Sequence, residues 1–146
     1  VLGPASGDFA RPVQGEAQGL QLAPHVHCRG RVSDAELNVL YANATALLMP
    51  SLYEGFGLPA LEAYYLGTPV CFVRGTSVEE VLSVATAKGG MSLSDPDSLL
   101  SALEEVFQMT PAEVRECGLR LREIYSLKAV SDRMLKVFQE VSRQYS

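Results

Sequence analysis

The sequence has little that would direct it to nucleic acid or into a membrane. It contains no run of basic residues, and its formal net charge at pH 7 is −5, so neither nucleic acid nor an anionic membrane surface is an expected partner. No apolar stretch approaches the roughly 18 residues that a membrane-spanning helix needs. No charged leader precedes the strand-like Val1–Leu2. These absences favour a globular domain that binds neither nucleic acid nor a membrane.

Cysteine is also scarce, with Cys28, Cys71 and Cys117 alone. An odd number of thiols, each inside an expected helix or strand, favours reduced cysteines and a cytoplasmic location. Cys28 follows His25 and His27, and such a cluster can bind a metal. No further ligand stands at a suitable spacing, so histidines at a strand edge are the preferred interpretation and no metal is expected.

What remains is the composition of one domain with its own core: 146 residues, 47% hydrophobic and 20% charged. Strand-like segments at 26–29, 46–49, 70–73 and 89–93 alternate with helical patterns. A weak helical pattern covers 8–22, and stronger ones begin at capping boxes, Ser33–Glu36, Ser77–Glu80 and Thr110–Glu113. Further helices are expected at 95–108 and 128–146. This alternation predicts an α/β fold, a Rossmann-like parallel sheet with helices on both faces.

The most informative stretch runs from Pro50 to Pro69, PSLYEGFGLPALEAYYLGTP. It predicts the end of a strand, a glycine loop, a short helix and a signal that ends this helix. Gly55 and Gly57 let the backbone bend sharply, and Pro59 suits the first turn of a helix. Gly67 suits the position just past the end of that helix.

The start of this helix offers unpaired backbone donors. The N–H groups of Phe56, Gly57 and Leu58 fall where the helix dipole adds partial positive charge, which favours phosphate or polyhydroxyl ligands. Glu54 and Glu62 flank the loop, and a carboxylate can accept two hydrogen bonds from a vicinal diol. The alternative is a tight turn with two solvated surface carboxylates.

The segment Glu54-Gly-Phe-Gly-Leu-Pro-Ala-Leu-Glu62 resembles the E-x7-E signature of the family 4 (group 1) retaining glycosyltransferases. Segments on both sides, among them Val26–Val32, Gly67–Val70 and Glu79–Glu80, also match in order. The resemblance covers nearly the whole chain and implies the carboxyl-terminal, donor-binding half of a GT-B fold. Residues 1–146 would then be one donor-binding domain, with 128–146 as a terminal packing helix.

The resemblance also implies roles for particular residues. Glu54 would be the catalytic residue that orients the sugar, and Gly55 to Leu58 would hold sugar and diphosphate through their amides. Glu62 would hold the ribose, and Arg31 and Val32 would lie beside the base. The donor substrate would be a nucleotide-diphosphate sugar, and enzymes of this kind generally need no metal or other cofactor.

Two departures from the family pattern weaken the enzyme interpretation. Compared with the family, the sequence is expected to begin after the amino-terminal acceptor domain and after the first strand and helix of this domain, whose Gly-Arg…Lys element clamps the diphosphate. Other cations are available, but none of them stands in a sequence context that matches this Gly-Arg…Lys element: Arg11, Arg29, Arg31, Arg74 and Lys88. Without its first strand the chain is expected to pair the flanking strands directly, to take a strand from a partner or a second copy, or to fold poorly. Abnormal association is the preferred outcome, and an apolar stripe of Met134, Phe138 and Val141 adds to it.

Several functions therefore stay open. The leading hypothesis is the donor domain of a hexosyl-transferring enzyme, cytoplasmic or held at the inner face of a membrane by its other domain, and inactive alone. The alternatives are a catalytically inactive sugar-nucleotide binding module, a sugar-nucleotide epimerase of similar fold, and an interaction domain without ligand. The sequence does not identify the base, the sugar or the acceptor.

Overall fold

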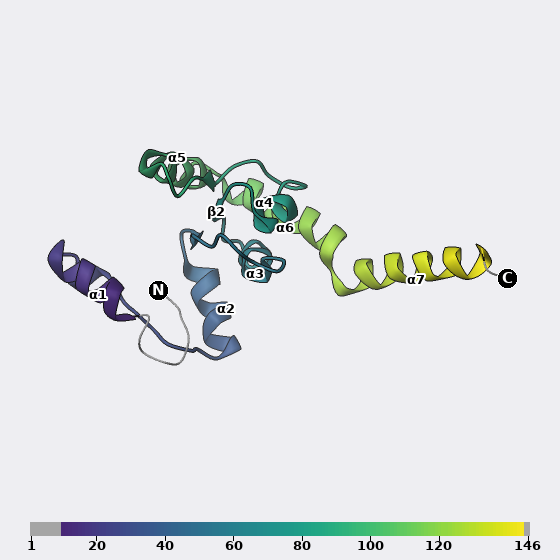
Figure 1. The fold of residues 1–146 in the computed structure, drawn as a ribbon, viewed down its shortest axis with the longest axis horizontal. Coiled ribbons are helices and arrows are strands. Elements are labelled where there is room, and N and C mark those ends of the chain that lie inside the picture. Colours follow the sequence, from purple (N-terminus) through teal and green to yellow (C-terminus); the bar gives the residue numbers. More distant parts are fainter. Residues whose placement is uncertain (1–9, 145–146) are drawn as a thin grey trace. The chain divides into compact units, whose positions relative to one another are not determined.

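The computed structural model describes residues 10–144. The chain divides into two compact units, Val1–Leu40 and Tyr41–Ser146, and Figure 1 traces the elements of each. The strand end expected at Val1–Leu2 lies outside the described residues. The assignment of residues 1–146 to one donor-binding domain stays a prediction.

The regular structure described in the first unit is mostly helical. It contains α1 (Ala10–Gly19), the short 3-10 helix η2 (Ala23–His25) and most of α2 (Asp34–Asn43). The capping box at the start of α2 is confirmed: the Ser33 amide donates to the Glu36 carboxylate over 2.9 Å, and the Glu36 amide donates back to the Ser33 hydroxyl over 3.3 Å. The backbone hydrogen bond, and then the one from the hydroxyl, lower the pKa of Glu36.

The strand predicted at Val26–Arg29 is wrong. The segment leaves η2 after His25 and is irregular except for an isolated bridge at Arg29. Pro24 lies inside η2, where its fixed φ and missing N–H suit a tight turn. The alternation of His25, Val26, His27 and Cys28 was therefore not a reliable strand signal.

The second unit is built on a parallel sheet in the order β1-β2-β3. Leu47–Met49 (β1) pairs with Val70–Val73 (β2), and β2 pairs with Gly90–Met91 (β3). These strands confirm the parallel sheet, with β3 shorter than the predicted 89–93. Between and after them lie α3 (Leu58–Tyr65), α4 (Ser77–Leu82), α5 (Pro96–Phe107), α6 (Pro111–Tyr125) and α7 (Leu127–Gln144).

Burial along β2 shows that helices cover both faces of the sheet. Its four side chains are at most 4% exposed, and successive side chains of a strand point to opposite faces. Helices α3, α4 and α5 contact β2, and α6 packs on α3. Both faces of the central strand are therefore inside the core.

Strand β1 differs because it lies at an edge of the described sheet. Leu48 is 44% exposed, although Met49 beside it is buried. An open edge with an apolar side chain favours pairing with a strand of another chain. The self-association predicted from the sequence stays a prediction that light scattering can test.

Helix boundaries follow their local signals with one exception. Thr110 and Glu113 form the expected capping box of α6. The box expected at Ser77–Glu80 is wrong, because Thr76 is the N-cap residue of α4 and makes no side-chain cap. The Ser77 hydroxyl instead donates to the Glu54 carbonyl.

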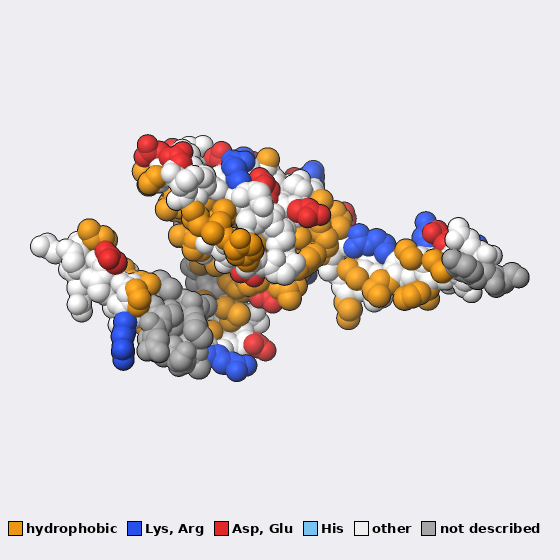
Figure 2. Space-filling model, in the orientation of Figure 1, with side chains coloured by type: hydrophobic (Ala, Val, Ile, Leu, Met, Phe, Trp, Pro, Cys, Tyr) orange, Lys and Arg blue, Asp and Glu red, His pale blue; other side chains and the backbone are white. Residues whose placement is uncertain are grey.

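The last helix, α7, is amphipathic and buries no residue. Met134, Phe138 and Val141 are 54%, 65% and 47% exposed, so the predicted apolar stripe is present on its surface. Figure 2 shows hydrophobic side chains along this helix. Among residues 10–144, no helix is long and apolar enough to cross a membrane.

Candidate functional site

The candidate site begins where β1 and β2 end. Because the two strands are parallel, their carboxyl ends lie at the same edge of the sheet. The loop 50–57 leaves β1 there, and the loop 74–76 leaves β2. A cleft of about 410 Å³ opens between the two loops. Its lining residues are Leu52, Tyr53, Glu54, Gly55, Gly75, Thr76 and Ser77.

Hydrogen bonds fix the two loops to each other and to the strands. Ser77 Oγ donates to the Glu54 carbonyl over 2.8 Å, and Thr76 Oγ1 donates to the carbonyl of Val73 over 2.7 Å. The Gly75 amide donates to a carboxylate oxygen of Glu79 over 2.6 Å. The position of Glu54 is therefore set by the second loop as well as by its own.

Gly57 turns the chain into α3. It is the N-cap residue and has φ of +85°, in the left-handed region that glycine tolerates best. A Cβ atom on Gly57 would come within 2.9 Å of Val78 Cγ2, so the loop also packs closely on α4. This position requires glycine for two independent reasons.

The backbone donors expected at the start of α3 are present. The Gly57 carbonyl accepts from the amides of Ala60 and Leu61, which places Gly57 and Leu58 at the amino end of the helix. Within residues 10–144, no acceptor takes a hydrogen bond from the amides of Gly57 and Leu58. These two N–H groups point from the positive end of the helix dipole and suit an anionic ligand.

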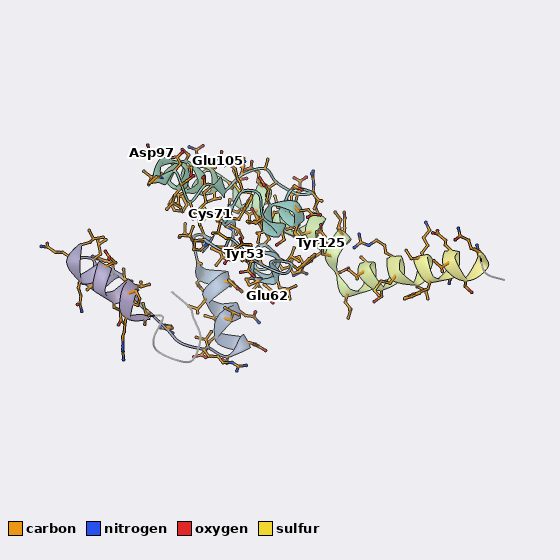
Figure 3. All side chains as sticks on the ribbon, in the orientation of Figure 1. Tyr53, Glu62, Cys71, Asp97, Glu105 and Tyr125 are labelled. Carbon is orange, nitrogen blue, oxygen red and sulfur yellow. The ribbon has the colours of Figure 1, made fainter. Side chains whose placement is uncertain are left out.

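Phe56 has a structural contact beside its place in the loop. Its ring meets the ring of Tyr125 edge to face, with 5.3 Å between the centroids. The contact joins the glycine loop to the carboxyl end of α6. Figure 3 labels Tyr125, the last residue of α6, and Tyr53, which precedes Glu54 in the loop. The side chain of Phe56 thus helps to hold the loop, while its amide stays part of the candidate site.

The two carboxylates of the motif lie in different surroundings. Glu54 is half-buried and lines the cleft. Glu62, labelled in Figure 3, is the fifth residue of α3. Its side chain is exposed and is not among the residues that line that cleft. Burial, and secondarily the charge of Glu62, raise the pKa of Tyr41, which places the Glu62 carboxylate near that ring.

The remaining predicted residues, Arg31 and Val32, belong to the first unit. Arg31 is exposed and Val32 is half-buried, directly before the capping box of α2. Their assignment to the base therefore stays a prediction. In contrast, Thr76 and Ser77 line the cleft but were missed as site residues. The rule that parallel strands end at one edge of a sheet could have identified them.

Among the described residues, no three His, Cys, Asp or Glu side chains lie together in a way that could hold a metal ion. The sequence contains one Asp-x-Asp, Asp95-Pro96-Asp97. It starts α5, where the Asp95 carboxylate accepts from the Asp97 amide over 3.1 Å. That pair therefore acts as a helix cap.

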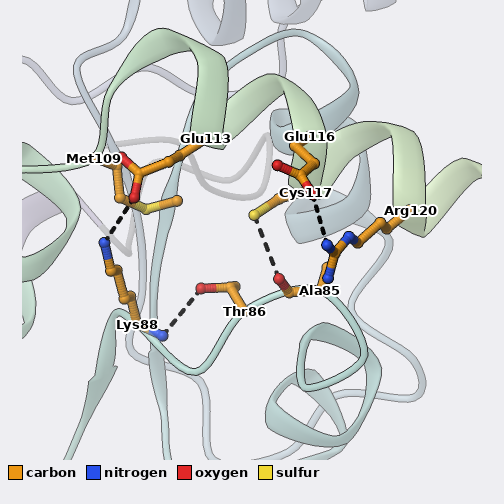
Figure 4. Close-up of a pocket in the computed structure, with 8 residues that line it drawn as sticks. All are labelled: Ala85, Thr86, Lys88, Met109, Glu113, Glu116, Cys117 and Arg120. Atoms are coloured by element: carbon orange, nitrogen blue, oxygen red, sulfur yellow. Dashed lines mark hydrogen bonds and ion pairs between the residues drawn. The ribbon is translucent and has the colours of Figure 1, made fainter.

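A second cavity, of about 190 Å³, has its charges paired internally. Lys88 meets Glu113 at 3.2 Å and Arg120 meets Glu116 at 2.6 Å, as Figure 4 shows. Cys117 Sγ donates to the Ala85 carbonyl, and burial raises the pKa of the thiol. Each cation here is already paired with a carboxylate, and the thiol stays protonated. This cavity is therefore a weaker candidate for a ligand site than the cleft at the strand ends.

Comparison with known proteins agrees with the sequence motif. The family model "Glycosyl transferases group 1" matches residues 1–117. The chain is 32% identical over 126 residues to the MMP alpha-(1->4)-mannosyltransferase of Mycolicibacterium hassiacum, covering 83% of this chain and 30% of that protein. It is 35% identical over 107 residues to the O-antigen chain mannosyltransferase RfbU of Salmonella typhimurium, covering 72% of this chain and 29% of that protein.

Solved structures show the same fold. The sucrose-phosphate synthase of Thermosynechococcus elongatus is similar with a TM-score of 0.73 and 25% identity, over 92% of this chain and 34% of that one. The Anabaena protein HepE, solved with UDP and glucose, is similar with a TM-score of 0.78 and 14% identity, over 95% of this chain and 39% of that one. The chain spans less than a third of the length of the two curated relatives named above.

Proposed function

The chain belongs to the group 1 glycosyl transferases, and on that premise we propose that it binds the nucleotide-diphosphate sugar of a retaining transferase. The observation that carries the proposal is the turn at Gly57, whose left-handed backbone leads two unpaired amides into the start of α3. Glu54 stands in the adjoining cleft. An anion and a polyhydroxyl group can thus be held side by side.

Each part of the donor has a partner in this arrangement. The amides of Gly57 and Leu58 would bind diphosphate oxygens, with Gly55 and Phe56 contributing the preceding amides. Glu54 would accept hydrogen bonds from hydroxyl groups of the sugar. The exposed Glu62 would accept from the two hydroxyl groups of the ribose. Arg31 and Val32 would lie near the base.

The reaction follows from this binding mode. A hydroxyl oxygen of the acceptor bonds to the anomeric carbon while the bond from that carbon to the diphosphate breaks. The hydroxyl proton passes to the leaving diphosphate. Amides at the start of α3 oppose the negative charge that grows on this group, and such preorganised donors commonly supply the largest catalytic contribution. Glu54 is the catalytic residue because it touches the reacting sugar.

Relatives suggest the first donors to test. The names of two curated relatives specify mannosyl transfer, and another is a GDP-mannose-dependent enzyme 28% identical over 96 residues. HepE was solved with UDP and glucose. A panel should therefore include GDP-mannose and UDP-glucose. We propose no metal or other cofactor, and we propose that the acceptor is bound by another domain.

A second candidate function is sugar-nucleotide binding without turnover. One observation favours it: the seven residues that line the cleft include no lysine or arginine. Arg74, which follows β2, donates to the Gly90 carbonyl over 3.1 Å and lies 3.8 Å from Glu79. Its charge is thus already engaged, and the leaving diphosphate would have amides but no cation from the cleft itself.

Calorimetry with two variants tests the proposal. Glu62→Gln should weaken the binding of nucleoside diphosphate about ten- to a hundredfold if the bound donor partly closes the exposed carboxylate off from water, since a hydrogen bond to a charged group then contributes about 1.5–3 kcal/mol. Glu54→Ala should leave nucleoside diphosphate nearly unchanged and weaken only the sugar-bearing donor. Unchanged nucleotide binding in Glu62→Gln would refute its ribose role. Equal losses for both ligands in Glu54→Ala would show that Glu54 shapes the loop instead.

A further inference from the structure

A second cleft lies at the other end of α3. Its volume is about 400 Å³, and its walls are the last turn of α3 and one face of α6. Its lining residues are Tyr64, Tyr65, Leu66, Gly67, Arg115, Gly118, Leu119 and Arg122. Helix α3 has eight residues, so the two ends are about 12 Å apart along its axis. The cleft is therefore distinct from the donor loop.

The charge of this cleft has one sign. Its lining contains two guanidinium groups and no carboxylate, although the whole chain carries a net charge of −5. Arg115 and Arg122 are seven residues apart, two helical turns, so they share one face of α6. Glu116 and Arg120 pair with each other and line a different cavity. The cationic pair is a local feature against an acidic background.

The two arginines are held differently. The Arg122 guanidinium lies 4.9 Å from the centroid of the Tyr65 ring and donates one hydrogen bond to the Tyr65 carbonyl over 3.2 Å. That bond offsets part of the negative charge at the carboxyl end of α3 and leaves further N–H donors, because a guanidinium has five. The Arg115 guanidinium has no hydrogen-bond or ion-pair partner among the described residues.

Close packing gives the cleft a fixed floor. A Cβ atom on Gly118 would lie 2.5 Å from the Tyr64 carbonyl oxygen, so α3 and α6 approach closely here. Leu66 and Leu119 are 37% and 53% exposed and add apolar edges. The result is a preformed hollow that offers one stacked arginine, one unpaired arginine and apolar surface.

We infer that this Arg115–Arg122 cleft is a second ligand site, which binds a phosphate group. Guanidinium groups match phosphate oxygens in geometry and charge, and one that is already oriented loses less freedom on binding. The apolar edges suit a phosphate joined to a carbon chain. The same chemistry occurs in a soluble phosphate ester and in the headgroup of an anionic lipid, and experiment can separate them.

Side-chain NMR of arginine tests the site without interference from the donor loop. Inorganic phosphate and glycerol 3-phosphate are titrated into the intact chain while the Nε–Hε signals of Arg115 and Arg122 are followed. Both signals should move and saturate with one affinity. Arg115→Gln should weaken that affinity about five- to tenfold. Signals that stay in place, or that drift without saturation, would overturn the inference.

A matched control lies on the same helix. Arg120→Gln removes another exposed cation, whose partner is Glu116, and it should change phosphate affinity less than about twofold. Equal losses of phosphate affinity in the two variants would mean that phosphate is attracted by the overall charge of α6, and would overturn the proposed site. Melting temperatures close to that of the unchanged chain would show that both variants fold, since neither side chain is buried.

Vesicles then identify the source of the phosphate. Sedimentation with phosphatidylcholine vesicles that contain phosphatidic acid is compared with phosphatidylcholine alone. Binding that needs phosphatidic acid and Arg115 supports the site and assigns it to a lipid headgroup. Saturable binding of glycerol 3-phosphate without vesicle binding supports the site and assigns it to a soluble ester.

Discussion

Replacing Gly57 by alanine should damage the turn on which the candidate site depends. Gly57 has φ of +85°, and a residue with a Cβ atom loses about 1–2 kcal/mol in that conformation. The new methyl group would also lie 2.9 Å from Val78 Cγ2. Val78 is 2% exposed, and a β-branched side chain has little rotamer freedom with which to move away.

These two effects set the expected magnitude. Overpacking of a tight contact costs about 1–3 kcal/mol, so Gly57→Ala should destabilise the fold by about 2–5 kcal/mol in total. In a chain of this length, 1 kcal/mol corresponds to about 3 °C in melting temperature. The expected loss is therefore about 6–15 °C, measured by calorimetry or circular dichroism.

Gly55 is the matched control, two residues away in the same loop. Its φ is not positive, and a Cβ atom there would meet nothing within 4 Å. Gly55→Ala should therefore leave the melting temperature within about 2 °C of that of the unchanged chain. The reasoning is refuted if Gly57→Ala melts like the unchanged chain, or if both variants lose the same stability.

Three further predictions concern other parts of the fold. Ser77→Ala removes the hydrogen bond to the loop carbonyl and should lower the free energy of unfolding by about 1 kcal/mol; urea titration with no loss would contradict this. Burial raises the pKa of Cys71 to about 11. An alkylating reagent at pH 8 should therefore modify the half-exposed Cys28 first and Cys71 only on unfolding. Equal rates of alkylation at the two cysteines, measured by mass spectrometry, would disprove it. Hydrogen bonds from the backbone and hydroxyl of Thr110, and secondarily the contact with Lys88, lower the pKa of Glu113 from 4.5 to about 2. The stability that these contacts add is present above pH 4.5 and is lost as the pH falls toward 2. Thr110→Val should shrink that acid-induced loss, and an unchanged profile of melting temperature against pH would contradict it.

Local signals predicted most of the second unit. Proline and glycine around the Pro50–Pro69 stretch marked the ends of α3, and the Thr110–Glu113 pair marked the start of α6. The buried run Val70–Val73 became the central strand. These predictions were correct because each feature depends on residues close in sequence, such as a capping side chain or a backbone angle that only glycine adopts easily.

Features that depend on distant residues were missed. Ser77 has the sequence pattern of a helix cap, but its hydroxyl is taken by the Glu54 carbonyl, 23 residues earlier. Its place in the cleft follows from the pairing of β1 with β2, which the local pattern does not contain. The strand predicted at Val26–Arg29 is reduced to a single bridge at Arg29, because alternation alone does not determine how much of a segment pairs with a neighbour.

The central claim is that the amides of the glycine loop hold the donor. Backbone amide NMR of the intact chain, titrated with GDP-mannose and UDP-glucose, tests it most directly. The account predicts that the largest shifts with at least one donor belong to Gly55, Phe56, Gly57 and Leu58, with smaller ones in the loop 74–76. Saturable donor binding that leaves these four amides unmoved, or no binding of either nucleotide sugar, would contradict it.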